Sequence, residues 1–169
     1  MSNKSRGSIE LHLITDRTQA DVDRVRALLR KWRDGTISAA EKADWALDLK
    51  GAYNASDLNR VGAAVRYVAG RLQEYGYKVA VAPKDDWLED DDPTAGQMES
   101  YRHDIAAIRS ALAVKPSTPP APDSMDGLTY IEANNIEQIL LDVDALLTLI
   151  SQGLYYSGEI YAGEIGGNP

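Results

Sequence analysis

The sequence contains no cysteine, and its first residues lack a long apolar run; each absence excludes a class of protein. Without cysteine there is no disulfide framework, no thiolate metal site and no cysteine nucleophile. The opening letters MSNKSRGS are polar and lead into only six mildly apolar residues, too few for a secretory signal or a membrane span. We therefore expect a soluble protein, and a length of 169 residues suits one domain with an appended segment.

Residues and motifs that support catalysis are scarce. The two histidines, His12 and His103, have no neighbours spaced as metal ligands or as a catalytic triad. No G-x-S-x-G, H-E-x-x-H, P-loop or G-x-G-x-x-G string occurs. The acidic run from Asp85 to Asp92 lacks the alternating ligands, central glycine and closing glutamate of an EF-hand loop, so we interpret it as a solvated loop. We expect no catalytic residue, no cofactor and no metal.

Basic residues are missing from the last third of the chain. No Lys, Arg or His follows Lys115, whereas eight acidic residues do, so this part carries the whole net charge of −8. Such an end repels phosphate and argues against nucleic-acid binding. The basic residues of the first predicted helix are interspersed with aspartates, which favours a solvated face over a phosphate site.

What the sequence does contain is a series of apolar stripes with helical spacing, each preceded by a capping signal. Apolar residues recur every three or four positions across residues 18–33, 55–75, 95–112 and 129–150. The predicted N-caps are Thr18, Ser38, Asn54 or Ser56, Thr94 and Thr129. A spacing near 3.5 residues indicates helices that pack at shallow angles in a bundle.

The predicted fold is therefore mainly α: a helical bundle of about four to five helices with a short N-terminal strand and an extended C-terminal tail. The strand is expected over residues 9–14, where IELHLI alternates apolar and polar residues, and VAVAP at 79–83 is ambiguous between a strand and a linker. The expected divisions are an N-terminal arm with the strand (1–17), a bundle body (18–113), a proline-rich linker (114–127), an amphipathic helix ending at Gly153 (128–153) and a tail (154–169).

The tail repeats one pentad, YSGEI at 156–160 and YAGEI at 161–165. A period of five fits neither a strand nor a helix, so we expect each unit to bend at its glycine. Tyrosine brings contact area at low entropic cost, which favours a ribbon that binds another chain; the alternative is a frayed end lying on its own bundle.

The last apolar stripe is long enough for packing within the chain or for pairing between copies. The residues expected to bind protein come from this stripe and from the tail: Ile136, Ile139, Val143, Leu146, Ile150, Tyr155, Tyr156, Glu159, Ile160, Tyr161, Glu164 and Ile165.

Several stretches taken together resemble a known group of proteins. They are LITDRTQADVDRVRALL, DLKGAYNASDLNRVGAAVRYVAGRL, DDWLEDDDPTAGQMESYRHDIAAIRSAL, PDSMDGLTYIEANNIEQILLDVDALL and YYSGEIYAGEI. Over about residues 11–165 the chain resembles uncharacterised tail-associated proteins of phages and prophages of gut Firmicutes. The resemblance implies a structural part of a tail, baseplate or fibre, made in the bacterial cytoplasm and located in the virion. It implies no catalytic residues, cofactor or receptor.

We therefore expect a non-enzymatic virion protein that assembles through its C-terminal helix and tail, with copies of itself and other tail proteins as partners, and with the host surface as a further partner. Two alternatives remain. One is a receptor-binding module in which Tyr155, Tyr156 and Tyr161 bind cell-surface carbohydrate, although tyrosines in a tail make a poor pocket. The other is a small acidic inhibitor of a host enzyme that mimics DNA, which would need carboxylates spread at phosphate-like spacing. A lytic hydrolase would need a poised pair of acids.

Overall fold

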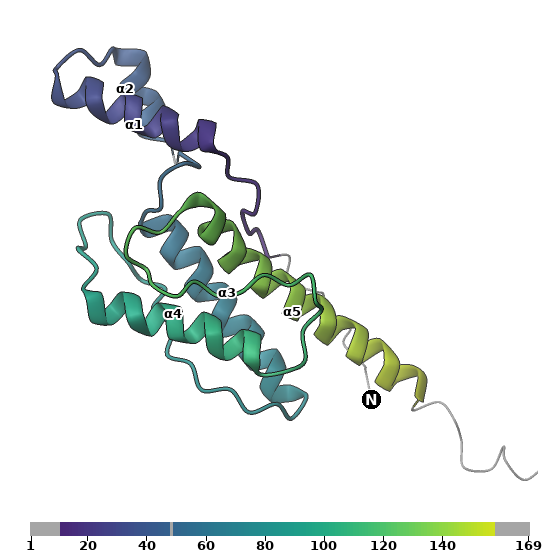
Figure 1. Ribbon diagram of the computed structural model, residues 1–169. Coiled ribbons are helices and arrows are strands. Elements are labelled where there is room, and N and C mark those ends of the chain that lie inside the picture. The colour runs from purple at the N-terminus through teal and green to yellow at the C-terminus, as the bar shows by residue number, and fades with distance from the viewer. Residues whose placement is uncertain (1–10, 48, 158–169) are drawn as a thin grey trace, which may run out of the picture.

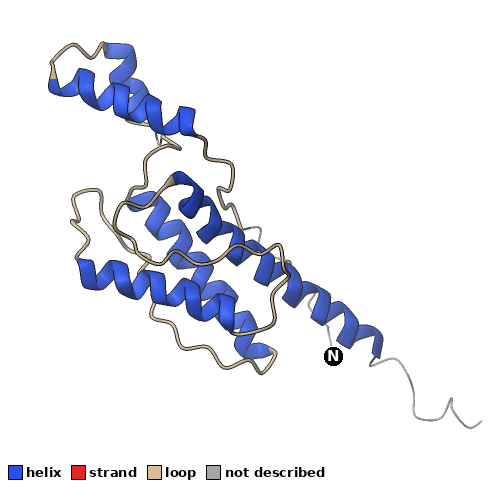
Figure 2. Ribbon diagram, viewed as in Figure 1, coloured by secondary structure: helices blue, strands red, loops and turns tan. Residues whose placement is uncertain are grey.

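The computed structural model of the chain describes residues 11–47 and 49–157. Within them the chain forms five helices and no strand, as Figures 1 and 2 show. The helices are α1 (Gln19–Arg33), α2 (Ala39–Trp45), α3 (Ala55–Glu74), α4 (Ala95–Ser110) and α5 (Tyr130–Ser157). The predicted mainly helical fold is confirmed.

The helices begin at the capping residues that the sequence predicts. Capping boxes open the first four helices at Thr18, Ser38, Asn54 and Thr94. The cap of α3 is thus Asn54 and not Ser56. At the start of α5, Thr129 Oγ1 accepts from the Glu132 backbone N–H at 3.2 Å, while the Glu132 carboxylate accepts from the Thr129 N–H at 2.8 Å. These bonds satisfy N–H groups that a helix leaves unpaired, so a four-residue signal decides where each helix starts.

Helices α3, α4 and α5 pack against one another around a single core, and we call them the three-helix body (Figure 1). The fully buried aliphatic residues of this core are Val61, Val68, Leu72, Ile105, Ile108, Ile136, Ile139, Leu140, Val143 and Leu147. Burying one such side chain stabilises the fold by roughly 1.5–3 kcal/mol. The last helix therefore shares the core of the body. The expected division had set it apart from the body, beyond a linker at residues 114–127.

The proline-rich segment 114–127 folds back over α4 and α5 (Figure 1). Thr118 is 3% exposed, and its hydroxyl donates to the Asp142 carboxylate at 2.7 Å. The Arg109 Nε–H donates to the Pro119 carbonyl at 2.6 Å. Contacts from both helices thus hold the segment down, so it connects neighbours in one core and does not space two units apart.

Helices α1 and α2 stand away from the body, and we call them with their connection the α1–α2 hairpin (Figure 1). The turn uses Gly35 at a φ of +68°, a conformation that favours glycine. The Trp32 and Trp45 rings contact each other with centroids 6.1 Å apart, yet Trp32 remains 49% exposed. Leu28 is the buried residue of α1, and α2 has none. The hairpin therefore adds little to the core, although the sequence placed it within the body.

The segments expected to be extended form no ladder among the described residues. Residues 9 and 10 of IELHLI lie outside the described residues, and residues 11–14 are loop. VAVAP is also loop, with Val79 and Val81 packed against the core. In the acidic run, Trp87 is 6% exposed and docks the loop onto the body, whereas Leu88 is 64% exposed.

The prediction that the last helix ends at Gly153 is wrong, because α5 continues to Ser157. A glycine inside a helix costs only about 1 kcal/mol relative to alanine, so one glycine does not by itself end a 28-residue helix. The tail beyond Ser157, with most of the doubled pentad, lies outside the described residues.

Truncating a core residue of α5 tests this packing. We expect Ile139→Ala to lower the free energy of unfolding by about 2–5 kcal/mol, since it removes fully buried methyl groups and leaves a cavity. The control Leu88→Ala, at a loop position that is 64% exposed, should change it by less than about 0.5 kcal/mol. Urea unfolding followed by circular dichroism measures both values, and equal losses would contradict this assignment of the buried face.

Candidate functional site

Four charged side chains meet inside the body, between the segment that precedes α1 and helices α3 and α5. We call Arg17, Asp57, Arg60 and Glu137 the buried ion cluster. Arg17 Nη2 lies 2.7 Å from both Asp57 Oδ1 and Glu137 Oε1, and Arg60 Nη2 lies 2.8 Å from Glu137 Oε1. Glu137 is fully buried, and Arg17 and Asp57 are 4% and 5% exposed. Two cations face two carboxylates, so the cluster buries no net charge.

Backbone groups before α1 are bonded to the same cluster. The Ile14 N–H donates to Glu137 Oε2 at 2.6 Å, and Arg17 Nη1 donates to the Ile14 carbonyl at 2.8 Å. The Asn134 side chain accepts from the Arg17 N–H at 3.0 Å and donates to the Arg17 carbonyl at 2.9 Å. Because the partners come from the chain itself, the cluster acts as a clamp that fixes residues 14–17 to α5.

A pair of tyrosines lies beside the clamp. The hydroxyl groups of Tyr53 and Tyr101 are hydrogen-bonded to each other, and the Arg17 guanidinium carbon lies 5.4 Å from the centre of the Tyr53 ring. Burial raises the pKa of both hydroxyls above the usual value of 10.0. Both groups are therefore neutral at physiological pH, and the pair serves as a buried hydrogen bond and not as a base.

A small pocket of about 180 Å³ lies between α3, α4 and the loop before the acidic run. Its wall includes Trp87 and Asp104, and the Asp104 carboxylate accepts from the Ala82 N–H at 3.1 Å. Burial raises the pKa of Asp104, while that hydrogen bond opposes the shift. The loop closes tightly over α3 because Gly62 has no side chain: a Cβ there would lie 2.2 Å from the Lys84 carbonyl oxygen. Pockets for small-molecule ligands usually exceed about 300 Å³.

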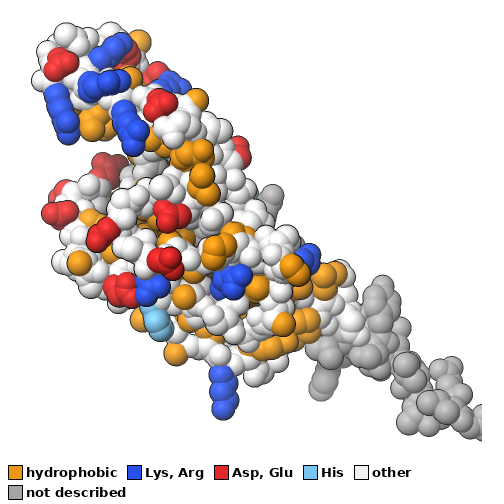
Figure 3. All heavy atoms as spheres, viewed as in Figure 1, with side chains coloured by type: hydrophobic (Ala, Val, Ile, Leu, Met, Phe, Trp, Pro, Cys, Tyr) orange, Lys and Arg blue, Asp and Glu red, His pale blue; other side chains and the backbone are white. Residues whose placement is uncertain are grey.

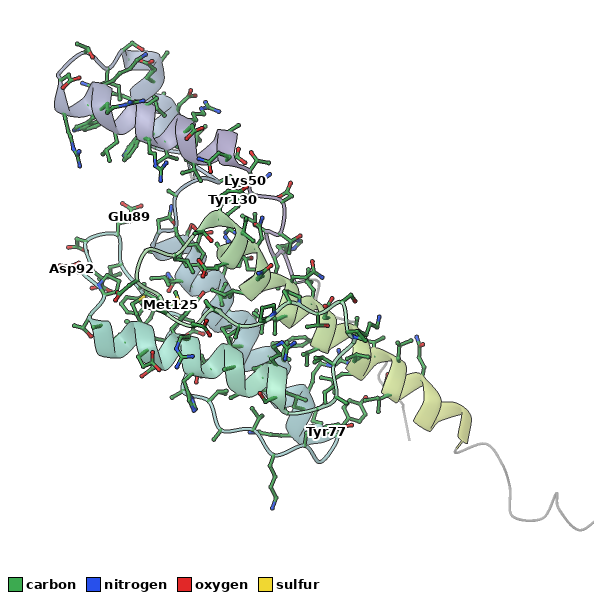
Figure 4. All side chains as sticks on the ribbon, viewed as in Figure 1. Lys50, Tyr77, Glu89, Asp92, Met125 and Tyr130 are labelled. Carbon is green, nitrogen blue, oxygen red and sulfur yellow. The ribbon has the colours of Figure 1, made fainter. Side chains whose placement is uncertain are left out.

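A second, larger hollow separates the α1–α2 hairpin from the N-terminal end of α5, and we call it the hairpin groove. It measures about 300 Å³; Val22 and Arg26 form part of one wall, and Leu128 and Ile131 part of the other. Ile131 is 54% exposed. No described residue that lines the groove is acidic. Figure 3 shows the molecule hollowed between hairpin and body, and Figure 4 places Lys50 and Tyr130 where the two parts approach each other.

At the other end of the molecule, α5 projects beyond the body (Figure 1). We call residues 146–157 the distal end of α5. Leu149 is 55% exposed and Leu146 is partly exposed, whereas Ile150 is half-buried and packs against the core. The described residues therefore leave an apolar strip of this helix uncovered where it leads into the pentads.

The expected protein-binding residues fall into three groups. Ile136, Ile139 and Val143 are fully buried in the chain's own core, so they bind no other chain in this fold, and for them the expectation is corrected. Leu146 and Ile150 belong to the distal end of α5, and the backbone of Tyr155 and Tyr156 continues the helix there. The remaining residues, Glu159, Ile160, Tyr161, Glu164 and Ile165, lie outside the described residues.

Reasoning from the sequence missed the buried ion cluster. One signal was present: Glu137 lies four residues after Ala133 and three before Leu140, both of which are buried, so its helical position predicts burial. Nothing local indicated that Arg17 would reach it. His12 and His103 are both exposed.

Two further properties concern the part of the chain that the structure describes. There, no group of three or more His, Cys, Asp or Glu side chains is arranged to hold a metal ion. None of the helices in the same part combines the length and the apolar character needed to cross a membrane.

Comparisons of the chain with protein-family models, with curated proteins and with solved structures found no significant match.

The buried ion cluster predicts a large effect of removing one cation. We expect Arg17→Met to lower the free energy of unfolding by about 3–5 kcal/mol, because two buried carboxylates would then share only Arg60. Arg24→Met, which breaks the exposed pair with Asp44, is the matched control and should cost less than about 1 kcal/mol. Chemical unfolding measures both, and a similar small loss in both variants would refute the clamp.

The raised pKa of Asp104 predicts a pH dependence. In the unfolded chain the Asp104 carboxyl has its ordinary pKa, near 3.8, and so loses its proton at a lower pH than it does in the folded chain. Above that pH, Asp104 therefore lowers the free energy of unfolding. Asp104→Asn retains an oxygen to accept from Ala82 but has no proton to release. We expect the variant to gain stability relative to the wild type between pH 3 and pH 7. Urea unfolding at both pH values, with the exposed Asp90→Asn as control, tests the sign.

Proposed function

We propose that the chain is a non-enzymatic structural protein of a phage virion, in the tail, baseplate or fibre region. It assembles with copies of itself and with other tail proteins through the distal end of α5 and the residues that follow. The observation that carries this proposal is the uncovered apolar strip on a helix that leaves the body and leads directly into the doubled pentad.

The way in which α5 is held supports an assembly role. Its first half is fixed by the Glu137 clamp and by the core around Ile139 and Val143. The distal end is therefore presented in a set direction, which lowers the entropy lost when another chain covers Leu149. Burying such a leucine is worth roughly 1.5–3 kcal/mol, and the pre-ordered helix leaves more of that gain to the contact.

The interior supports a non-enzymatic role. The buried charges of Arg17, Asp57 and Glu137 are bonded to one another, and the buried hydroxyls of Tyr53 and Tyr101 form a closed pair. Catalytic groups need a donor or acceptor that is free to contact a substrate, whereas these carboxylates and hydroxyls bond to other segments of the fold, although the buried Arg17 Nε has no partner among the described residues. The setting in the virion, after synthesis in the bacterial cytoplasm, rests on the resemblance of the sequence to phage tail-associated proteins.

A shortened chain tests the assembly role. We compare the mass in solution of the full chain with that of a chain ending at Ser157, which retains every described helix. We expect the full chain to form a defined oligomer and the shortened chain to be a monomer with unchanged helical circular dichroism. Light scattering across a hundredfold range of concentration measures the mass. Monomers in both cases would contradict assembly through this end.

The virion setting needs a separate measurement. Particles released from a bacterial strain that carries the gene are purified on a density gradient, and their proteins are identified by mass spectrometry. We expect peptides of this chain to copurify with tail proteins. Their confinement to the cell lysate would contradict the setting without affecting the assembly role.

A further inference from the structure

We propose that the hairpin groove of one copy receives residues 158–169 of a second copy, which we call the pentad segment, so that copies join head to tail. The inference rests on the proposed function, because it names the surface to which the C-terminal segment binds. Three observations support it: the side chains that line the groove, the composition of the segment, and the distance between the two.

The groove combines apolar surface with the weakly paired guanidinium group of Arg26. The Arg26 side chain is 69% exposed, and its nearest carboxylate oxygen is that of Asp23, at 3.9 Å. Val22 lies one helical turn before Arg26 on the same wall, and Ile131 presents an exposed side chain opposite. The groove also lies at the N-terminal end of α5, where the helix dipole adds positive potential.

Further cations extend this wall along α1. Arg30 and Arg33 follow Arg26 at four and seven residues, which places all three on one face of the helix. Within the described part of the chain, neither Arg30 nor Arg33 forms an ion pair. The cations on the other side of α1 differ, because Arg24 and Lys31 pair with Asp44 and Glu41. Carboxylates of the hairpin thus neutralise the cations on one of its faces. Arg30 and Arg33, on the face that continues from the groove, have no such partner among the described residues.

The pentad segment has the complementary composition. It contains Glu159 and Glu164, Ile160 and Ile165, and Tyr161, and it has no basic residue. Carboxylates at a regular interval suit a row of arginines, and the isoleucines and tyrosine suit the apolar wall. Among the described residues, those that line the groove include no acidic side chain that would repel the segment.

The distance excludes docking within one chain. The groove lies at the start of α5, whereas the pentad segment follows its last residue, and the 28 residues of α5 span about 42 Å. Glu164 and Ile165 lie within eight residues of Ser157, and eight residues reach at most about 29 Å when fully extended. The acidic and apolar residues of the segment therefore cannot reach the groove of their own chain. A second copy has no such limit.

A contact between two different surfaces of the same chain has a geometric consequence. Each copy offers one groove and one pentad segment, so every copy can bind a neighbour on each side. Such heterologous contacts close into a ring if the rotation between copies permits it, and otherwise extend as a filament.

The test uses full-length variants that each damage one of the two surfaces. Arg26→Glu reverses the charge in the groove, and Glu159→Arg/Glu164→Arg reverses it in the segment. Lys78→Glu makes the same change of charge as Arg26→Glu at an exposed loop position that lines neither surface, and is the control. We expect either damaged surface to weaken self-association about tenfold or more, as for a lost charge pair, and the control to leave it unchanged.

Mixing the two damaged variants gives the decisive result. The Arg26→Glu chain keeps an intact segment, and the Glu159→Arg/Glu164→Arg chain keeps an intact groove, so the mixture restores the native contact; the reversed groove and the reversed segment are also opposite in charge. We expect neither variant to associate alone at a concentration where an equimolar mixture associates in sedimentation velocity. If a change in circular dichroism shows that Arg26→Glu disturbs the fold, the exposed Ile131→Ser takes its place on the opposite wall.

Other outcomes overturn the inference in distinguishable ways. If the chain ending at Ser157 is monomeric but Arg26→Glu and Ile131→Ser associate like the wild type, the segment binds elsewhere and only the groove assignment fails. If a full-length monomer expands on Arg26→Glu, the groove is covered by its own chain. If the chain ending at Ser157 keeps the oligomeric mass of the full chain, copies associate without the pentad segment, so this inference fails while assembly through the distal end of α5 stands. If both chains are monomers, the proposed function fails and this inference fails with it.

Discussion

The pairing of Arg17 with Asp57 and Glu137 is the constraint on which the rest of the structure depends. A buried charge without a partner is costly, so the three side chains have to stay together once the core has formed. Arg17 directly precedes Thr18, the cap of α1. The clamp therefore decides where the α1–α2 hairpin leaves the body, and with it where the hairpin groove opens.

The same clamp makes the two ends of the molecule different from each other. Glu137 fixes the first half of α5, so the helix starts beside the hairpin and its distal end projects on the opposite side, as Figure 1 shows. One end presents arginines beside apolar surface, and the other presents an apolar strip leading to an acidic segment. A chain with two different and complementary ends is suited to building assemblies, and this is the physical basis of the function that we propose.

The predictions that the structure confirms rest on local sequence patterns. Capping boxes and apolar stripes involve residues three or four positions apart, so helix starts such as Thr94 and the helical character of the fold could be predicted without knowing the partners. Predictions about what lies between or beyond helices fared worse. Four prolines between residues 114 and 127 indicated a spacer, yet Thr118 and Arg109 bind that segment to the body, and Gly153 did not end α5.

The sequence by itself determined which residues form helices, which face of each is apolar and which end of the chain is acidic, because these properties depend on near neighbours. Only the tertiary structure decided what covers each face. Periodicity shows that Ile136, Ile139 and Val143 need burial, but the choice between the chain's own core and another copy depends on packing against α3 and α4. The clamp joins Arg17 to a residue 120 positions away, and no local pattern records a contact that forms only when distant segments meet in one core.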